Sequence, residues 1–138
     1  RSIRQDYRPP HPVRAVEFLK KNQIAGRVFN DEKFGGFLLW TSYPDLKPFV
    51  DGRQLYPERY FTDYLGVMQD PVQNWPAAQK KYQFDLVLLD KTWVLSQRFT
   101  QYLNASEAWK LIFSDAHALV YAPRDLSVEA LHLNHRGN

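Results

Sequence analysis

The stretch FDLVLLD, residues 84–90, is the part of this 138-residue chain that most clearly decides the fold. Its centre is an unbroken aliphatic run, and a carboxylate stands on each side of the run, at Asp85 and Asp90. A half-buried strand alternates apolar and polar residues, whereas a strand covered on both faces reads as a continuous apolar run. The stretch therefore predicts a strand in a sheet that is covered by helices on both faces.

Segments with helical spacing of apolar residues alternate with short apolar strands along the rest of the chain. The first helix begins after Pro12, has Val16, Leu19 and Ile24 on its apolar face, and is expected to stop at Gly26. Such alternation is typical of folds in which helices connect parallel strands. Further helices are predicted over residues 31–43, 57–69, 74–82 and 93–103, and strands over 27–30, 47–51, 84–89, 108–113 and 117–122.

The predicted fold class is a three-layer, Rossmann-like α/β domain with a mostly parallel five-stranded sheet and a C-terminal antiparallel hairpin. We predict the strand order 2-1-3-4-5, with the first four strands parallel. The fifth strand is expected to return antiparallel through the polar turn at residues 114–116.

The domain is expected to occupy residues 13–125, since a chain of this length suits one core. Residues 1–12 contain three prolines and are interpreted as an extended lead-in or linker, and residues 126–138 as a C-terminal tail. The chain starts at Arg1 without methionine, so we expect it to be a piece of a longer protein.

Composition excludes several kinds of function. The absence of cysteine excludes disulfides and thiolate chemistry. The 18 basic and 15 acidic residues are spread along the chain, so the net charge of +3 indicates no nucleic-acid partner. The apolar runs are far shorter than the roughly 20 residues that span a bilayer. His132 and His135 have no third ligand near them in the sequence, so we predict no metal and no other cofactor.

The glycine pair Gly35-Gly36 lies in the stretch NDEKFGGFLLW, residues 30–40, and has two readings. A phosphate-binding loop needs Gly-x-Gly-x-x-Gly or a Gly-Lys-Ser/Thr ending, and the stretch has neither. Two glycines inside a helix cost roughly 0.8–1.0 kcal/mol each relative to alanine. We therefore expect close packing of this helix on the sheet to offset the cost, and we expect Asp31 to cap its first turn.

Polar residues at the ends of predicted strands form the candidate ligand site. Predicted strands end in the polar residues Asn30, Asp51 and Asp90, and Arg53 comes shortly after the second of these strands. Ligands of open α/β sheets bind beyond the carboxyl ends of parallel strands, so these residues are predicted to line one crevice. The Arg53 guanidinium would clamp a carboxylate or phosphate there. The structural alternative is that these residues cap helices and form turns, of which Asp51-Gly52 is a typical pair.

Aromatic residues are dense around the second predicted strand. Such side chains stack on sugars or form partner surfaces, and they also pack in cores, which we take as the main expectation. No Gly-x-Ser-x-Gly motif is present, and no catalytic residue is predicted. The aromatic set is Trp40, Tyr43, Tyr56, Tyr60, Phe61 and Tyr64.

The order of these features resembles a soluble domain found in bacterial polytopic membrane proteins. The resemblance runs from AVEFLKKNQIAGRVFNDEKFGGFLLWTSYPDLKPFVDGR through KYQFDLVLLD to the pair WKLIFSD and ALVYAPR. Those membrane proteins are similar to lipid-linked-sugar glycosyltransferases of the protein mannosyltransferase and oligosaccharyltransferase type. The specific parts of the resemblance are Asn30, Gly35-Gly36-Phe37 with Trp40, and Asp51-Gly52-Arg53.

The resemblance implies a non-catalytic domain on the extracytoplasmic, periplasmic face of a membrane. The catalytic acids of that family lie in its membrane region, so no catalytic residue carries over to this chain. The implied partners are the membrane region of the same parent chain and a glycan or lipid-linked sugar. The competing hypothesis is a free-standing Rossmann-like enzyme, or a nucleotide- or nucleotide-sugar-binding domain, that uses the strand-end crevice.

Overall fold

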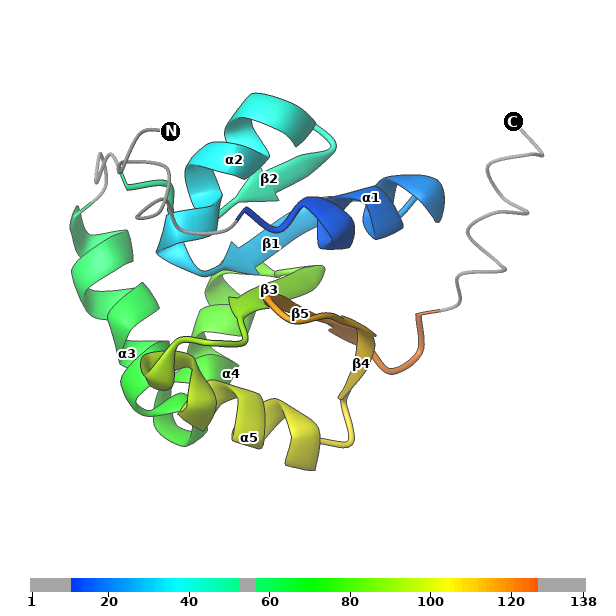
Figure 1. Cartoon of the computed structure of the whole chain (residues 1–138). Coiled ribbons are helices and arrows are strands. Elements are labelled where there is room, and N and C mark those ends of the chain that lie inside the picture. Colours follow the sequence, from blue (N-terminus) through cyan, green and yellow to red (C-terminus); the bar gives the residue numbers. More distant parts are fainter. Residues whose placement is uncertain (1–10, 53–56, 127–138) are drawn as a thin grey trace.

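The computed structural model describes residues 11–52 and 57–126 and has the predicted α/β class, with five strands and helices between them. Figure 1 shows the elements in chain order. The strands are β1 Gly26–Asn30, β2 Leu46–Pro48, β3 Leu86–Asp90, β4 Trp109–Ser114 and β5 Ala118–Pro123. The helices are α1 Val13–Lys21, α2 Glu32–Ser42, π-helical η2 Glu58–Tyr64, α3 Leu65–Gln69, α4 Pro71–Tyr82, 3₁₀-helical η3 Val94–Ser96 and α5 Gln97–Ala105.

The strands form one mixed sheet in the order β2-β1-β3-β5-β4. β1 pairs in parallel with β2 and with β3, as predicted. β5 pairs antiparallel with β3 on one side and with β4 on the other. The predicted order 2-1-3-4-5 is therefore wrong at its last two positions, because the hairpin folds back so that β5 lies next to β3.

The burial of the two hairpin strands gives the physical reason for this arrangement. β5 is buried from Ala118 to Ala122, whereas β4 leaves Leu111 and Ser114 exposed. An edge strand has a neighbour on one side only, so the continuously apolar strand takes the inner place. β4 still runs in the direction of β3, since each of them is antiparallel to β5.

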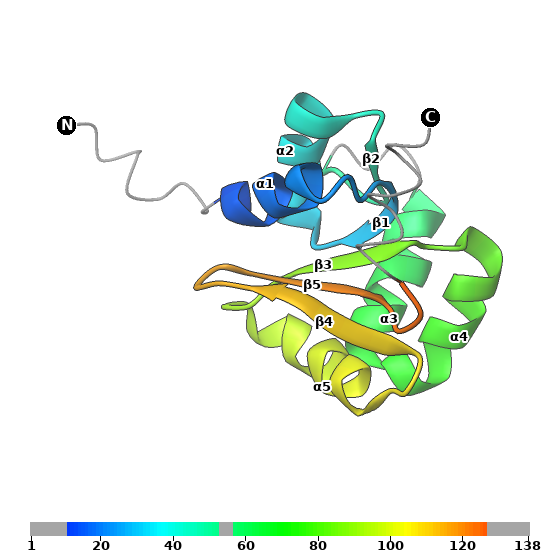
Figure 2. The same ribbon diagram turned by 90° about the vertical axis from the view of Figure 1, so that its right-hand side faces the viewer.

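Helices cover both faces of the sheet and give it two different cores. In Figure 2, α1 and α2 lie above the sheet, and α3, α4 and α5 lie below it. The core under α1 and α2 is mainly aliphatic and includes Leu19, Val28, Leu38, Leu46, Leu86, Leu88 and Val120. The core on the other face is mainly aromatic and includes Phe29, Phe49, Tyr64, Trp75, Phe84, Phe99, Trp109 and Tyr121.

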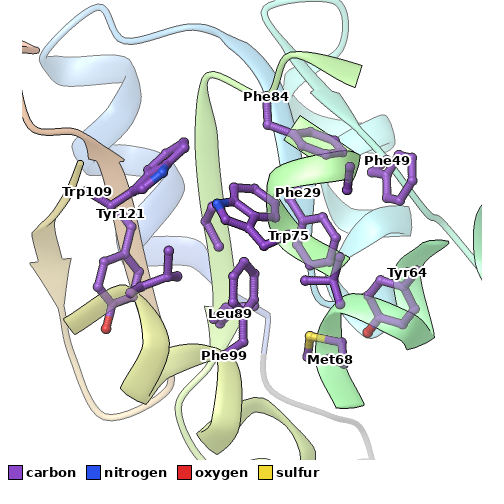
Figure 3. Close-up of a cluster of buried hydrophobic side chains, with 14 of the residues drawn as sticks. Phe29, Phe49, Tyr64, Met68, Trp75, Phe84, Leu89, Phe99, Trp109 and Tyr121 are labelled. Carbon is purple, nitrogen blue, oxygen red and sulfur yellow. The ribbon is translucent and has the colours of Figure 1, made fainter. Parts of the chain in front are cut away.

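Phe29 lies at the centre of the aromatic core, where Figure 3 shows rings from several elements around it. Its ring centroid lies 5.2 Å from that of Phe99, 5.3 Å from that of Phe84 and 5.5 Å from that of Trp75, all in edge-to-face geometry. Such pairs contribute roughly 0.5–1.5 kcal/mol each beyond the burial of their area. Phe29 in β1 thereby joins the sheet to α4 and α5.

Several predicted boundaries differ from the observed ones. α1 ends at Lys21, so the buried Ile24 lies beyond it. The strand predicted over residues 47–51 is shorter in the structure, where β2 spans Leu46–Pro48. α4 begins before residue 74, because the Asp70 side chain accepts a hydrogen bond from the Gln73 amide at 3.2 Å and caps the helix ahead of Pro71. In residues 11–52 and 57–126, no helix combines the length and the apolar character that crossing a membrane requires.

Candidate functional site

The carboxyl ends of β1 and β3 lie side by side and carry a group of polar residues that we call the strand-end cluster: Asn30, Asp31, Lys33 and Asp90. The two strands are in parallel register, with Asn30 opposite Leu88. The Asp31 amide continues the pairing by donating to the Leu88 carbonyl at 2.9 Å. The structure thus brings two of the predicted site residues, Asn30 and Asp90, to the expected edge of the sheet.

Asn30 is fully buried, and its amide is committed to the protein. Its Nδ2 donates to the carbonyls of Asp31 at 2.9 Å and Val50 at 2.7 Å. Its Oδ1 accepts from the amides of Phe49 at 2.7 Å and Val50 at 3.4 Å. A side-chain amide offers two donors and two acceptor positions, so the capacity of Asn30 is filled. Asn30 therefore ties the segment after β2 to the end of β1.

Asp90 is also buried and is held by three groups. Its Oδ2 lies 2.7 Å from the Lys33 ammonium, and its Oδ1 accepts from the Thr92 amide at 2.8 Å and the Thr92 hydroxyl at 2.7 Å. Burial alone would raise the pKa of Asp90, but the hydrogen bonds from Lys33 and Thr92 outweigh it and lower that pKa. The Lys33 ammonium also lies 4.8 Å from the centre of the Trp93 ring, so an aromatic face covers the ion pair.

Asp31 occupies the N-cap position of α2, but its side chain makes no capping hydrogen bond, so the predicted cap is wrong. Its Oδ2 instead accepts from the Ser96 hydroxyl at 3.2 Å and the Asp90 amide at 3.4 Å. Its Oδ1 is buried without a hydrogen-bond partner among the described residues. Burial is the main cause that raises the pKa of Asp31 to about 6; the neighbouring Asp90 adds to this, while Lys33 opposes it. The fold therefore favours the protonated carboxyl.

The glycine pair lies where α2 crosses the segment after β2. A Cβ atom on Gly35 would lie 2.0 Å from the Val50 carbonyl oxygen and 2.4 Å from the Asp51 Cα, so the close approach predicted for the pair occurs at this position. Gly36 has nothing within 4 Å of such an atom, and no packing in the structure explains it. Gly52 has a φ of +86°, which a glycine adopts without strain.

The remaining predicted site residues are Asp51 and Arg53, and the predicted crevice stays a prediction. Asp51 is half-buried beside Gly35. Arg53 lies outside the described residues, as does Tyr56 of the aromatic set. The other members of that set divide between core and surface: Tyr64 is fully buried and Tyr60 packs against it, whereas Trp40, Tyr43 and Phe61 are exposed.

A second group of charged residues lies at the amino ends of β1 and β2. We call it the basic pocket, an open hollow of about 330 Å³ lined by Arg27, Lys47, Pro48, Phe49, Arg59, Lys81, Tyr82 and Phe84. Its cations come from four separate elements, so no sequence motif marks it. The sequence does contain one indication of the pocket: the pattern Arg27-x-Phe29, in β1, is repeated as Lys47-x-Phe49, which begins in the adjacent β2.

The two groups differ in what they can do chemically. The strand-end cluster holds its carboxylates away from solvent and offers no open pair for general acid and base chemistry. In residues 11–52 and 57–126, no group of three His, Cys, Asp or Glu side chains is arranged to hold a metal ion. The chain matches no protein-family model, no curated protein and no solved structure.

Proposed function

We propose that this chain is a non-catalytic domain of a membrane-bound, glycosyltransferase-like protein, on the extracytoplasmic side of the membrane. Its task would be to dock at the membrane surface beside the membrane region of its parent chain and to help position a glycan or lipid-linked sugar. The proposal starts from the resemblance of residues 15–53 and of the later strands to such domains. The observation that carries it is an exposed aromatic surface at the end of α2.

That surface consists of Trp40 and Tyr43, which are 89% and 59% exposed. The Lys20 ammonium donates to the Thr41 carbonyl at 2.9 Å, so a cation lies at the same end of α2. Tryptophan is usually well buried in folded proteins. Trp and Tyr are enriched where a membrane meets water, because their rings prefer the headgroup region, and lysine favours anionic lipid. The combination is suited to contact with a membrane surface.

The strand-end cluster supports the non-catalytic part of the proposal. The hydrogen-bonding capacity of Asn30 is filled by the backbone, and the Asp90 carboxylate is held by Lys33 and Thr92. A ligand at this edge would have to break those bonds, each contributing roughly 0.5–3 kcal/mol. Their arrangement stabilises the junction of β1, β2 and β3 and offers little to a substrate.

Sedimentation with lipid vesicles tests the proposal. We expect the chain to sediment with vesicles of phosphatidylcholine mixed with phosphatidylglycerol, and Trp40→Ser to reduce the bound fraction several-fold. Phe61→Ser is the matched control, because Phe61 is 58% exposed but belongs to η2. Absence of vesicle binding, or equal losses in the two variants, would contradict membrane docking through this surface.

A second candidate function is a Rossmann-like enzyme, and the raised pKa of Asp31, about 6, is the observation that favours it. A carboxyl that titrates close to neutral pH is suited to proton transfer. Nucleotides and nucleotide-sugars at a hundredfold excess over their dissociation constant would stabilise such an enzyme by about 2.7 kcal/mol. Thermal unfolding with these compounds separates the candidates: a reproducible shift that is lost in Asp31→Asn favours the enzyme, and no shift favours the docking domain.

A further inference from the structure

The basic pocket places four cationic side chains around one hollow, and two of them project from the same face of the sheet. Arg27 and Lys47 are opposite each other in the parallel register of β1 and β2. Side chains at opposed positions of a parallel pair point to the same face, which here is the face of Phe29 in β1 and of Phe49 directly after β2. The pocket therefore opens on the aromatic face of the sheet, beside its β2 edge.

The other two cations come from the helices that border this face. The Arg59 guanidinium lies 5.3 Å from the centre of the Phe49 ring and 5.7 Å from that of Tyr82. The Lys81 ammonium lies 3.2 Å from an Asp63 carboxylate oxygen and 5.1 Å from the centre of the Tyr82 ring. Stacking on an aromatic face restricts a long side chain. Arg59 and Lys81 are thereby held at the border of the pocket.

The nearby acids neutralise only part of this charge. Asp63 accepts from both Lys81 and the Tyr82 hydroxyl, and Glu58 is a more distant partner of Lys81 at 3.8 Å. Among the described residues, those that line the pocket include four cations and no carboxylate. Arg27 uses one guanidinium nitrogen to donate to the Tyr82 carbonyl at 3.1 Å. Within the described part of the chain, the exposed Lys47 ammonium has no ion-pair or hydrogen-bond partner.

A purely structural role explains the position of Lys47, but it does not explain why the four cations lie around one hollow. Lysine on an edge strand discourages pairing with another chain, and β2 is an edge strand. Arg27, Arg59 and Lys81 each make a contact within the protein, but these contacts leave four cations around one hollow, where like charges repel one another. An anion in the hollow would relieve this repulsion, and phosphate oxygens suit both the planar guanidinium fork and the lysine ammonium.

We propose that the basic pocket binds a phosphate-bearing ligand, with Lys47 and Arg27 contacting the phosphate oxygens and Arg59 and Lys81 completing the positive wall. Its volume of about 330 Å³ is at the lower end of the range for small-molecule sites and leaves room for a diphosphate group. The aromatic side of the pocket, Phe49 and Tyr82, would contact whatever the phosphate is attached to. This inference stands apart from the proposed docking at a membrane, since it uses a different surface.

Calorimetric titration of the whole chain with inorganic pyrophosphate at low salt tests the pocket. We expect binding that weakens as salt is added, and a dissociation constant about tenfold higher in Lys47→Gln, because one charge-assisted contact is lost. Lys21→Gln is the matched control: it removes the same charge from an exposed position at the end of α1, on the other face of the sheet, and should change affinity by less than about twofold. No binding at millimolar pyrophosphate, or equal losses in both variants, would overturn the proposal.

A second experiment, with lipid vesicles, distinguishes a lipid headgroup from a free phosphate ester as the ligand. If the ligand is a lipid headgroup, phosphatidic acid added to phosphatidylcholine vesicles should increase binding of the chain, and Lys47→Gln should remove that increase. If the ligand is a free phosphate ester, only pyrophosphate binding should depend on Lys47. Trp40→Ser should leave pyrophosphate binding unchanged, so failure of membrane docking and failure of the pocket are distinguishable. Pyrophosphate binding that is lost in Trp40→Ser and kept in Lys47→Gln would overturn the assignment.

Discussion

The two ends of the parallel strands carry charge in opposite ways. At the carboxyl ends, the strand-end cluster turns its charges inward, where Lys33 and Thr92 hold the Asp90 carboxylate. At the amino ends, the basic pocket gathers four cations around an open hollow. Buried, paired charges specify how elements meet, whereas converging exposed charges are available to a ligand. The comparison predicts that substitutions at the carboxyl ends change stability, while substitutions in the basic pocket change binding.

The largest expected effect at the carboxyl ends comes from Gly35→Ala. The added methyl group would lie 2.0 Å from the Val50 carbonyl oxygen, so α2 would have to move away from the segment after β2. Overpacking of this kind typically costs 1–3 kcal/mol, and contact with backbone places the expected cost at about 3 kcal/mol or more. Chemical denaturation measures the loss of unfolding free energy.

Gly36→Ala is the matched control for this substitution. It has nothing within 4 Å of the new methyl group, and alanine has the higher helix propensity. We expect it to stabilise the chain by about 0.5–1 kcal/mol. Equal effects of the two substitutions would show that close approach of α2 is not what requires glycine.

Asn30→Ala is expected to have the next largest effect. The substitution leaves the Phe49 amide and the Val50 carbonyl buried without the partners that they have in the structure. Unsatisfied buried groups cost roughly 1–3 kcal/mol each, so we expect a loss of about 2–4 kcal/mol in unfolding free energy. Asn22→Ala serves as a control, because that half-buried side chain makes one hydrogen bond within the described residues, to the Phe18 carbonyl, and its loss should cost about 1 kcal/mol.

Asp31 should make stability depend on pH in an unusual direction. Its pKa in the folded chain is about 6, against an ordinary value of 3.8, so the folded state binds this proton more tightly than the unfolded state does. Stability contributed by the protonated group is present below pH 4 and is lost as pH rises to 6 and beyond, by roughly 3 kcal/mol in total. Asp31→Asn should remove this decline, and denaturation curves between about pH 4 and 7 measure it.

Asp90 provides the opposite trend when the same measurement is extended below the ordinary pKa of an aspartate, 3.8. Its pKa is lowered, so its stabilising contribution is present above the ordinary value of 3.8 and is lost as pH falls below it. The Asp31→Asn variant should keep this loss at acid pH. A variant whose stability follows the unaltered chain across the whole range would contradict the role of Asp31.

The smallest effect on stability is expected at the basic pocket. Lys47→Gln removes an exposed charge from an edge strand, and surface substitutions of this kind usually change the unfolding free energy by less than about 0.5 kcal/mol. We expect Lys47→Gln to have the same unfolding free energy as the unaltered chain but a lower affinity for pyrophosphate. A loss of stability as large as that of Asn30→Ala would remove the distinction between the two ends.

The parallel half of the sheet was predictable because its strands are short apolar runs separated by helices. The order of the last two strands was predicted incorrectly, although the sequence contains the information. Ala118 to Ala122 are continuously apolar apart from the Tyr121 hydroxyl, as for an inner strand, whereas Trp109-Lys110-Leu111 places a charge between apolar residues, as for an edge. The prediction placed β4 beside β3 from chain order alone. In the structure the more buried strand, β5, lies beside β3 instead.

The candidate site was predicted in part for a similar reason. The positions of Asn30 and Asp90 follow from parallel strands ending at one edge, which a sequence pattern can indicate. Whether the polar atoms of Asn30 are available depends on backbone groups that are distant in the chain, such as the Val50 carbonyl to which Asn30 donates. The cations of the basic pocket are likewise separated along the chain and are brought together by the pairing of β1 with β2 and by the positions of η2 and the end of α4.

The aromatic core has an optical consequence. Trp75 in α4 and Trp109 in β4 are both buried, with ring centroids 5.5 Å apart and planes inclined at 65°. Indole rings this close share their electronic excitation, which splits their circular dichroism into two bands of opposite sign. The amplitude of the split signal depends on the separation of one helix from one edge strand, so it would fade when α4 moves away from β4 even if both kept their backbone conformation. The circular dichroism of this tryptophan pair would therefore report whether α4 stays packed on the sheet.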